Sequence, residues 1–484
     1  MVNVLDKLVM AVSPQRGLER LRARSAAGAL MNFDAANPAR KTTAKARGGD
    51  ADTAGAKRMR LAFLSRDMIR NNPWAANAQH VVTRNVVGDG ILSKIVGGTD
   101  ASRKDLLKRI ERHLDTTKID IRGRQNLYGI QALIVNTVVD SGEALVRRVR
   151  GGRDMALPFQ LEVMEPDFLD TSRNGPIEGG MLEEGIEFDD SGRRVAYWLY
   201  EHHPGSSGFL RSRFRSVRVP ASEILHIYRQ DRPGQERGVS WLAPVALQLQ
   251  DMHDFQDAQL MRQKISACFA AFRITPDTEP NAEDPGGLST IVPGRIQRLA
   301  PGEDVRFADP PGVQNYDEFT RSVLSAVAAG MHISFDSLTG DLRQANFSSL
   351  RAGNLQMNLS ISSWQWLMLI PQFLQPLAEW IKESWLMSVQ VQGQDDTRIE
   401  WVPPRRPLVD PAREIPAMIK MVRAGFISRA EMIRQLGFDA ERVTTEIKED
   451  AKLVDELDLT FDTDPRKVTN SGQAQQPDLI EDGD

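Results

Sequence analysis

The strongest pattern of apolar and polar positions runs from Tyr316 to Trp385. It begins with apolar side chains spaced three or four residues apart, which predicts one face of a helix: Tyr316, Phe319, Val323 and Val327. Gly330 stands where this helix would end, because glycine takes the left-handed conformation without a Cβ clash. A polar loop over residues 331–347 follows and contains Gly340. We interpret both glycines as hinges that let the loop move between packed helices.

A longer helix is predicted after this loop, and Ser348 or Ser349 can cap its start. Large apolar residues recur along it: Leu350, Leu355, Leu359, Trp364, Trp366, Leu369, Phe373, Leu377, Trp380 and Trp385. Pro371 and Pro376 should kink or break it, because a proline lacks the N–H that the helix needs. This apolar surface exceeds what a thin domain could cover, so it predicts burial against a large partner surface.

The chain upstream is predicted to alternate between helices and short strands. Apolar spacing indicates helices at about 58–69, 73–87, 101–114 and 129–139, with Pro73 suited to a turn or a first helical position. Short β-prone runs bounded by Gly, Pro and Asp predict strands at 91–96, 144–149, 160–164, 185–188, 194–200 and 224–228. His226 in the last run is interpreted as a strand histidine with a satisfied hydrogen bond, with a ligand role as the alternative.

A long helix is predicted from residue 240 to about 272, with Ser240 as its cap and Pro244 in its first turn. One face is apolar: Val245, Leu249, Met252, Phe255, Met261, Ile265, Cys268 and Phe272. The other face is rich in Gln and Asp: Gln248, Gln250, Asp251, Asp254, Gln256, Asp257 and Gln259. Cys268 on the apolar face is interpreted as a buried, inert thiol. In the Pro- and Gly-rich stretch that follows, strands are expected at 288–292, 294–299 and 304–307.

The two ends of the chain differ in composition from its middle. Residues 13–58 contain few large apolar side chains and cannot bury enough surface to offset chain entropy, which predicts a flexible arm. Its basic residues either lie in a solvated tail or meet DNA or an acidic protein surface. An apolar patch at residues 2–12 carries Asp6 and Lys7 and no clear cleavage site, which favours an arm over a signal peptide.

Three helices are expected near the C-terminus, at 411–424, at 429–436 and from there to about residue 457. Ser428 and Glu431 have the spacing of a capping box for the second of them. Residues 463–484 are polar and expected to be disordered.

Composition narrows the class of protein. The chain has 484 residues, 26% of them charged and 41% hydrophobic, as in ordinary globular proteins of two to four domains. The net charge of -4 does not indicate a general nucleic-acid binder. A single cysteine, Cys268, excludes an internal disulfide framework and a cysteine-based zinc cluster. No segment reaches the roughly 18 uninterrupted apolar residues of a membrane span.

Two triplets match the aspartic-protease signature, in which paired carboxylates activate water: Asp140-Ser141-Gly142 and Asp190-Ser191-Gly192. They lie too close together in sequence to belong to two similar lobes, and the second suits a hairpin turn. We interpret both as turns. His202-His203 lacks partners at ligand spacing and is expected at the surface. No glycine-rich loop followed by Lys-Ser/Thr is present, so the chain is not expected to be a motor.

Four arginines nearly alternate along one segment, which places several guanidinium groups on one side of an extended chain: Arg211, Arg213, Arg215 and Arg218. We interpret them as guarding an exposed edge strand or forming a salt-bridge ladder between subunits. Contact with phosphate is the alternative.

A series of short motifs occurs in a specific order: Asn71-Asn72-Pro73-Trp74-Ala75, Glu165-Pro166-Asp167, Val219-Pro220-Ala221-Ser222-Glu223-Ile224-Leu225-His226, Gly238-Val239-Ser240-Trp241-Leu242-Ala243-Pro244, Leu338-Thr339-Gly340-Asp341 and Asn346-Phe347-Ser348-Ser349-Leu350-Arg351-Ala352-Gly353. In this order they resemble the lambda-like family of bacteriophage portal proteins over most of residues 58–460. None of the motifs is catalytic, and each is short, so the resemblance depends on their joint order.

The resemblance implies an α+β, predominantly α portal fold, with subunits assembled as a cyclic ring, usually a dodecamer. It divides the chain into a flexible arm (1–57), a wing (58–238), a stem helix (239–272), a clip (273–315), a second stem helix (316–330), a tunnel loop (331–347), a wing helix with a return strand (348–400), a crown (401–462) and a disordered tail (463–484).

The resemblance also implies roles for particular residues. The channel-facing tunnel loop would present Asp341, Leu342, Arg343, Gln344 and Asn346. Packing between subunits would use Trp364, Trp366, Trp380 and Trp385. The clip facing the terminase would present Arg295, Arg298, Glu303 and Asp304. A conduit must contact DNA without holding it, which fits a stem face rich in Gln and Asp and a loop with Arg343 as its one cation.

The implied function is that of a head-tail connector at one capsid vertex, for viral genome packaging and ejection. Its partners would be double-stranded DNA read without sequence specificity, the terminase large subunit, the major capsid protein, and scaffold and head-completion proteins. No membrane, cofactor, metal or catalytic residue is expected, and the subunit would occupy the virion after assembly in the host cytoplasm. The alternatives are another viral head or baseplate scaffold and an aspartic-type protease that uses Asp140.

Overall fold

The computed structural model describes residues 55–467 except 153, 207–214, 268–270, 275–303, 308–315, 344–345, 389–395, 405–409, 437, 439, 462–463 and 465. Most of the predicted arm, clip and tail therefore lies outside the described residues. The chain divides into two units, Met1–Ala56 with Gln230–Arg237, and Lys57–Arg229 with Gly238–Asp484. In the first unit, the side-chain oxygen of Gln235 accepts a hydrogen bond from the Asp231 N–H at 2.8 Å. The second unit holds all the features below.

The first half of the second unit contains the predicted helices. They are α3 (Gly55–Asn71), α4 (Pro73–Val86), α5 (Asp100–His113) and α6 (Leu127–Ser141). Pro73 occupies the first turn of α4, and the side-chain oxygen of Asn72 accepts hydrogen bonds from the N–H groups of Trp74 and Ala75. The Asn-Pro pair thus ends one helix and starts the next, because asparagine caps the free N–H groups and proline needs none.

The strands form small antiparallel sheets. A three-stranded sheet has the order β3-β2-β9, and a five-stranded sheet has the order β4-β5-β6-β7-β8. Their bounds are β2 (Glu143–Arg150), β3 (Phe159–Met164), β4 (Gly175–Ile177), β5 (Gly180–Glu183), β6 (Ile186–Asp189), β7 (Arg194–Tyr200), β8 (Ser216–Pro220) and β9 (Ile224–Tyr228). Two-stranded sheets join β1 (Leu92–Val96) to β12 (Arg398–Val402) and β10 (Ala271–Ile274) to β11 (Asp304–Phe307). The predicted strands within the described residues are confirmed, and β4, β5 and β10 were missed.

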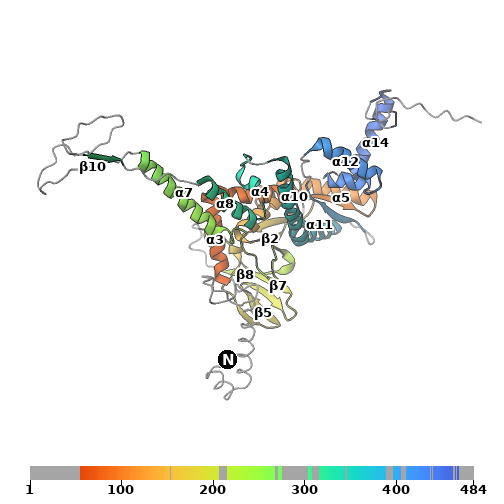
Figure 1. Cartoon of the computed structure of the whole chain (residues 1–484). Coiled ribbons are helices and arrows are strands. Elements are labelled where there is room, and N and C mark those ends of the chain that lie inside the picture. The colour runs from red at the N-terminus through yellow and green to blue at the C-terminus, as the bar shows by residue number, and fades with distance from the viewer. Residues whose placement is uncertain are drawn as a thin grey trace, which may run out of the picture. The chain divides into compact units, whose positions relative to one another are not determined.

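The three-stranded sheet separates two apolar cores. Leu145 and Val146 are neighbours on β2 and point to opposite faces, as successive strand residues do. Val146 belongs to a core that includes the helices α4, α6 and α11, whereas Leu145 packs with residues of the five-stranded sheet such as Ile186 and Leu199. In Figure 1, β5, β7 and β8 lie together in yellow and green, away from α11.

The second half of the unit is mainly helical. Its elements are α7 (Ala246–Ala267), α8 (Tyr316–Gly330), α9 (Phe335–Thr339), α10 (Phe347–Trp364), the π-helix η7 (Gln365–Leu374), α11 (Gln375–Ser388), α12 (Pro411–Arg423), α13 (Arg429–Gln435) and α14 (Ala440–Glu456). The predicted helix from residue 240 begins later, at Ala246, because residues 241–245 form turns. Phe272, expected on this helix, lies in strand β10.

A kink or a break was predicted at Pro371 and Pro376, and the helix does not break there. The chain stays helical from Phe347 to Ser388, and its central ten residues widen into the π-helix η7, which contains Pro371. At the end of η7, the Gln375 N–H bonds to the Ile370 carbonyl five residues earlier. A π-turn accommodates a residue without an N–H by shifting the hydrogen-bond register, so the proline is absorbed without ending the helix.

The described helices include none with the length and apolar character needed to span a membrane.

Candidate functional site

The connection between α8 and α10 is the candidate channel loop. It begins at Met331 and Ile333, which are both buried, and His332 between them has a positive φ of 55°. Gly330, predicted to end α8 in a left-handed conformation, is instead its last helical residue. A Cβ at Gly330 would lie 2.4 Å from Cγ1 of Val245, so this glycine is required for close packing. The helix thus ends at Gly330 as predicted, but the predicted left-handed conformation was wrong, and the left-handed residue is His332; the hinge stays a prediction.

The loop also contains a short helix, α9, which the sequence did not predict. The Ser334 side chain caps it by accepting a hydrogen bond from the Ser337 N–H. Gly340 ends it in the left-handed conformation, with a φ of 68°. The Asn77 side chain on α4 donates to the carbonyls of Ser337 and Leu338 at 3.1 and 2.7 Å. Residues 334–339 are therefore held against α4, and the exposed part of the loop begins after Gly340.

Asp341 and Arg343 form a closed ion pair in the exposed part of the loop. The Arg343 Nε and Nη2 donate to the two carboxylate oxygens of Asp341, each at 2.9 Å. Asp317 on α8 lies 3.3 Å from Arg343, and Arg321 lies 3.6 Å from Asp341. The hydrogen bond from Arg343 lowers the pKa of Asp341 to about 2. Both groups thus stay ionised near neutral pH, and two carboxylates and two guanidinium groups balance one another.

The other predicted loop residues have different surroundings. Leu342 is exposed. Asn346 caps α10 in a capping box with Ser349, so the predicted cap at Ser348 or Ser349 lies two or three residues too late. Gln344 lies outside the described residues. Of the predicted DNA-facing set, Leu342, Arg343 and Asn346 are exposed, and Asp341 is partly buried.

Three of the four tryptophans assigned to ring packing are buried within the chain itself. Trp364 packs against Trp241 with ring centroids 4.8 Å apart, and Trp380 lies beneath the Arg148 guanidinium at 5.0 Å. Trp385 is 1% exposed, and its Nε1–H donates to Asp105 at 2.9 Å. The surplus apolar surface of this segment is thus partly covered by its own subunit, and a role for these three between subunits stays a prediction.

Trp366 differs from the other three because it is 54% exposed. Leu359 and Leu367 are also largely exposed, at 74% and 72%. Helical spacing places Leu359 and Trp366 on the same side, seven residues apart. We call Leu355, Leu359, Trp366 and Leu367 the α10–η7 patch. It is the part of the tryptophan segment that is available to another molecule.

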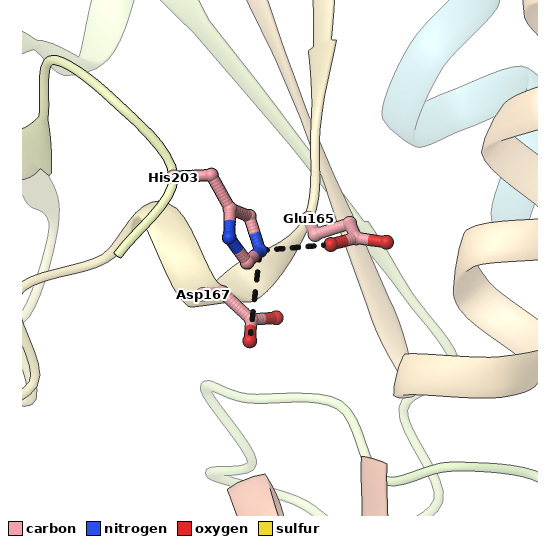
Figure 2. Close-up of side chains that lie close together, drawn as sticks. All are labelled: Glu165, Asp167 and His203. Carbon is pink, nitrogen blue, oxygen red and sulfur yellow. Dashed lines mark hydrogen bonds and ion pairs between the residues drawn. The ribbon is translucent and has the colours of Figure 1, made fainter. Parts of the chain in front are cut away.

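His203, expected to be a surface residue without partners, lies beside two carboxylates. Figure 2 shows its Nε2 facing Glu165, at 3.1 Å, and Asp167, at 3.9 Å. The sequence could not reveal this cluster, because the two carboxylates of the Glu165-Pro166-Asp167 motif meet a histidine from a separate loop. The expectation of a partnerless His203 was therefore wrong.

By the distances between their ligand atoms, Glu165, Asp167 and His203 could together hold a metal ion. Their hydrogen bonds do not favour one. The Gly205 N–H donates to His203 Nδ1 at 3.0 Å, so the ring proton of a neutral histidine sits on Nε2, which donates to Glu165. Arg66 donates to Asp167 at 2.5 Å and already supplies a positive charge. We interpret the cluster as a junction that joins α3 to the strands.

The two Asp-Ser-Gly triplets lie in different local structures. Asp190-Ser191-Gly192 forms the β6–β7 hairpin turn, as predicted, and the Asp189 carboxylate caps it by accepting from the Ser191 N–H. Asp140 and Ser141 end helix α6, and Gly142 is its left-handed cap with a φ of 93°. Asp140 faces Arg66, Gln79 and Ser141. The first triplet is thus a helix end, where a turn had been predicted.

Burial raises the pKa of Asp140 to about 6. A carboxyl with a raised pKa binds its proton more tightly in the folded than in the unfolded state. Folding stability should therefore fall as pH rises from about 4 to 6, by up to about 3 kcal/mol for a shift of roughly two units. Asp140→Asn should remove this loss and raise the free energy of unfolding at pH 7 by about 1–2 kcal/mol, since some hydrogen bonding is weakened.

Urea denaturation at pH 4.5, 5.5 and 7.0 checks this prediction. The stability difference between Asp140→Asn and the unaltered chain should grow with pH. Asp190→Asn, in the exposed hairpin turn, is the matched control and should show a small, constant difference. A difference for Asp140→Asn that does not vary with pH would contradict the prediction.

The remaining predicted residues fall in three groups. β8 lies at one edge of its sheet, which supports the edge-strand interpretation. Arg218 on β8 pairs with Glu187 at 2.7 Å. Arg211 and Arg213 lie outside the described residues. His226 is buried and bonds to Glu143 at 3.0 Å, as predicted for a strand histidine. Asp304 begins β11, whereas Arg295, Arg298 and Glu303 lie outside the described residues.

Ser428 accepts a hydrogen bond from the Glu431 N–H and caps α13 as predicted. The Glu431 carboxylate bonds to Arg434, so the reciprocal half of the capping box is replaced by an ion pair.

The chain is similar in sequence to known phage portal proteins. The family model described as "Phage portal protein, lambda family" matches residues 36–365. A probable portal protein of Halomonas phage phiHAP-1 is 26% identical over 439 residues, covering 85% of this chain and 83% of that protein. Portal protein B of Escherichia phage lambda is 20% identical over 437 residues, covering 78% and 80%. A solved structure titled "Neck of native GTA particle computed with C12 symmetry" covers 80% of this chain and 94% of its own, at 15% identity and a TM-score of 0.48.

Proposed function

Because the chain belongs to the lambda family of phage portal proteins, we propose that it forms a ring of twelve subunits around a DNA channel. The ring would occupy one capsid vertex, where DNA is packaged by a docked terminase motor and later ejected. The observation that carries this proposal is the charge balance of the exposed loop after Gly340, where Asp341 and Asp317 neutralise Arg343.

A channel for moving DNA needs contact without tight binding. Each cation that neutralises a phosphate releases counterions and strengthens binding, so an unpaired basic loop would hold the duplex. Arg343 in this loop is paired with two carboxylates, and Leu342 beside it offers an exposed apolar tip. Asp251, Asp254 and Asp257 are exposed along α7, so the stem candidate also presents negative charge. The balanced loop would not hold a phosphate backbone, and the carboxylates of α7 would repel it, so a duplex could slide past both surfaces.

The ring requires apolar surface for contact between subunits. The α10–η7 patch supplies it on one face, with Trp366 more than half exposed. A cyclic ring uses head-to-tail interfaces, in which each subunit presents two different surfaces. We therefore assign the patch to the subunit interface. Trp364, Trp380 and Trp385 would support it from within the core.

The clip would dock the terminase large subunit and later the head-completion proteins. The antiparallel pairing of β10 with β11 places residues 271–274 beside residues 304–307, near the two ends of the predicted clip. The proposed terminase-facing residues are Arg295, Arg298, Glu303 and Asp304. As a structural subunit, the chain is assigned no catalytic residue.

Replacing Asp341, Leu342 and Arg343 together with glycine tests the channel function. Ring formation should be unchanged, because none of the three side chains is buried. If the loop contacts DNA, the amount of DNA packaged or retained should fall by about tenfold or more. A tenfold lower rate corresponds to a free-energy barrier to DNA movement that is higher by roughly 1.4 kcal/mol. Packaged DNA is measured by nuclease protection in an assembly reaction.

The matched control replaces Asp190 and Ser191 with glycine in the exposed β6–β7 turn. It should leave packaging unchanged. If the loop variant packages and retains DNA as well as this control, the loop is not the DNA-contacting element. Class averages from electron microscopy test the ring itself: solid particles or open filaments would contradict it.

A further inference from the structure

The C-terminal helices bury very little of their apolar surface within the chain. No residue of α12 is buried, and on α14 only Ala440 and Val454 are. Between them, α13 buries only Met432. Most of a helix's stability in a protein comes from packing its apolar face, because short isolated helices are marginal in water. The exposed apolar faces of α12 and α14 are therefore available to a partner from outside their own chain.

Each of these two helices presents an apolar stripe to solvent. On α12, Ile415 and Ile419 lie one turn apart and are each nearly half exposed. On α14, Leu453 is exposed, and so is Leu457, which lies four residues later and whose N–H bonds to the Leu453 carbonyl. The stripes have the spacing of helix–helix contacts, in which side chains three and four residues apart share a face. Each stripe is thus suited to pack against another helix.

The charges beside the two stripes are opposite. α12 carries three basic residues and one acidic residue, and Lys420 directly follows Ile419. α14 carries six acidic and three basic residues, and Glu449 and Asp450 lie four and three residues before Leu453, on the same side of the helix. Opposite charge at the rim of an apolar contact selects its partner, because like charges placed together cost free energy. This pattern favours pairing α12 with α14 over pairing either helix with its own copy.

We propose that α12 of one subunit packs on α14 of the neighbouring subunit, with the two apolar stripes in contact and Lys420 facing Glu449 and Asp450. This inference rests on the ring proposed above. A head-to-tail ring brings a different surface of each neighbour together at every interface, which is what two complementary helices on one chain require. The contact would link the predicted crown (residues 401–462) of each subunit to the crown of the neighbouring subunit.

Cysteine cross-linking tests the contact directly, and the single native cysteine simplifies it. The variant carries Cys268→Ser, Ile419→Cys and Leu453→Cys, and assembled rings are treated with a short bis-maleimide. Denaturing gels should show a ladder of covalent multimers. The matched controls carry Ile419→Cys alone or Leu453→Cys alone with Cys268→Ser, and should show no ladder.

Charge reversal provides the second arm. Lys420→Glu with Arg423→Glu should reduce the ladder about tenfold, corresponding to roughly 1.4 kcal/mol lost at each contact. Adding Glu449→Lys and Asp450→Lys should restore it. Native mass spectrometry of the same samples reports ring size independently of cross-linking.

The outcomes separate this inference from the proposed function. Intact rings with a ladder and charge rescue support the contact. Intact rings without a ladder, or with cross-links confined to monomers, overturn the contact and leave the ring standing. Monomers alone by native mass spectrometry overturn the ring, and the contact with it.

Discussion

Trp385→Ala is expected to lower the free energy of unfolding of the isolated subunit by about 3–5 kcal/mol. Trp385 on α11 is 1% exposed, so its removal leaves a large cavity in the main core. It also removes the hydrogen bond from its Nε1–H to Asp105. The midpoint of urea denaturation, followed by far-UV circular dichroism, measures the change.

Trp366→Ala is the matched control for this cavity. Trp366 is the same residue type in the same continuous helix, but it is 54% exposed. Its replacement should change subunit stability by less than about 1 kcal/mol. If Trp366 packs between subunits, the same variant should need a higher protein concentration to form rings. Equal loss of subunit stability in both variants would show that exposure does not separate the roles of these tryptophans.

Gly142→Ala is expected to lower the free energy of unfolding by about 2–5 kcal/mol, the sum of a left-handed backbone penalty and a steric clash. Gly142 has a φ of 93° at the end of α6. A Cβ added there would lie 2.4 Å from the carbonyl carbon of Val239 and 2.6 Å from the Ser240 nitrogen. Those atoms belong to backbone, which cannot swing aside as a flexible side chain can. Urea denaturation again provides the measurement.

Gly340→Ala separates the two parts of this penalty. Gly340 has a φ of 68°, but a Cβ there would meet no atom within 4 Å. It should therefore cost only the backbone part, about 1–2 kcal/mol. A Gly142→Ala variant no less stable than Gly340→Ala would show that the α6 end and the Val239–Ser240 backbone can separate without cost.

The sequence was informative wherever a local rule acts within a few residues. The Asn72-Pro73 pair starts α4 because capping and proline geometry are properties of adjacent residues. The left-handed stop at Gly340 and the hairpin turn at Asp190-Ser191-Gly192 follow from glycine's freedom at positive φ. Family membership also came from the order of short motifs, and the family model confirmed it.

Tertiary structure decided what depends on distant residues. Gly330 could be read as a helix stop from its neighbours, but its role is set by Val245, which packs where a Cβ would stand. Pro371 breaks an isolated α-helix, yet this segment is held by long-range contacts: the Gln365 side chain donates to the Val86 carbonyl, and the Tyr228 N–H donates to the Gln372 side chain. Such contacts can offset a local preference of a few kcal/mol.

By itself, then, the sequence determined the family, most helices and strands, and the existence of a polar loop between two apolar helices. The structure decided how that loop is built: α9 and Asn77 fix its first half, and Asp341 with Asp317 balances Arg343 in its exposed half. It also showed that Trp366, among the four tryptophans, faces outward. Periodicity shows which residues share a helix face, whereas burial depends on segments that are distant in sequence and meet only in the fold.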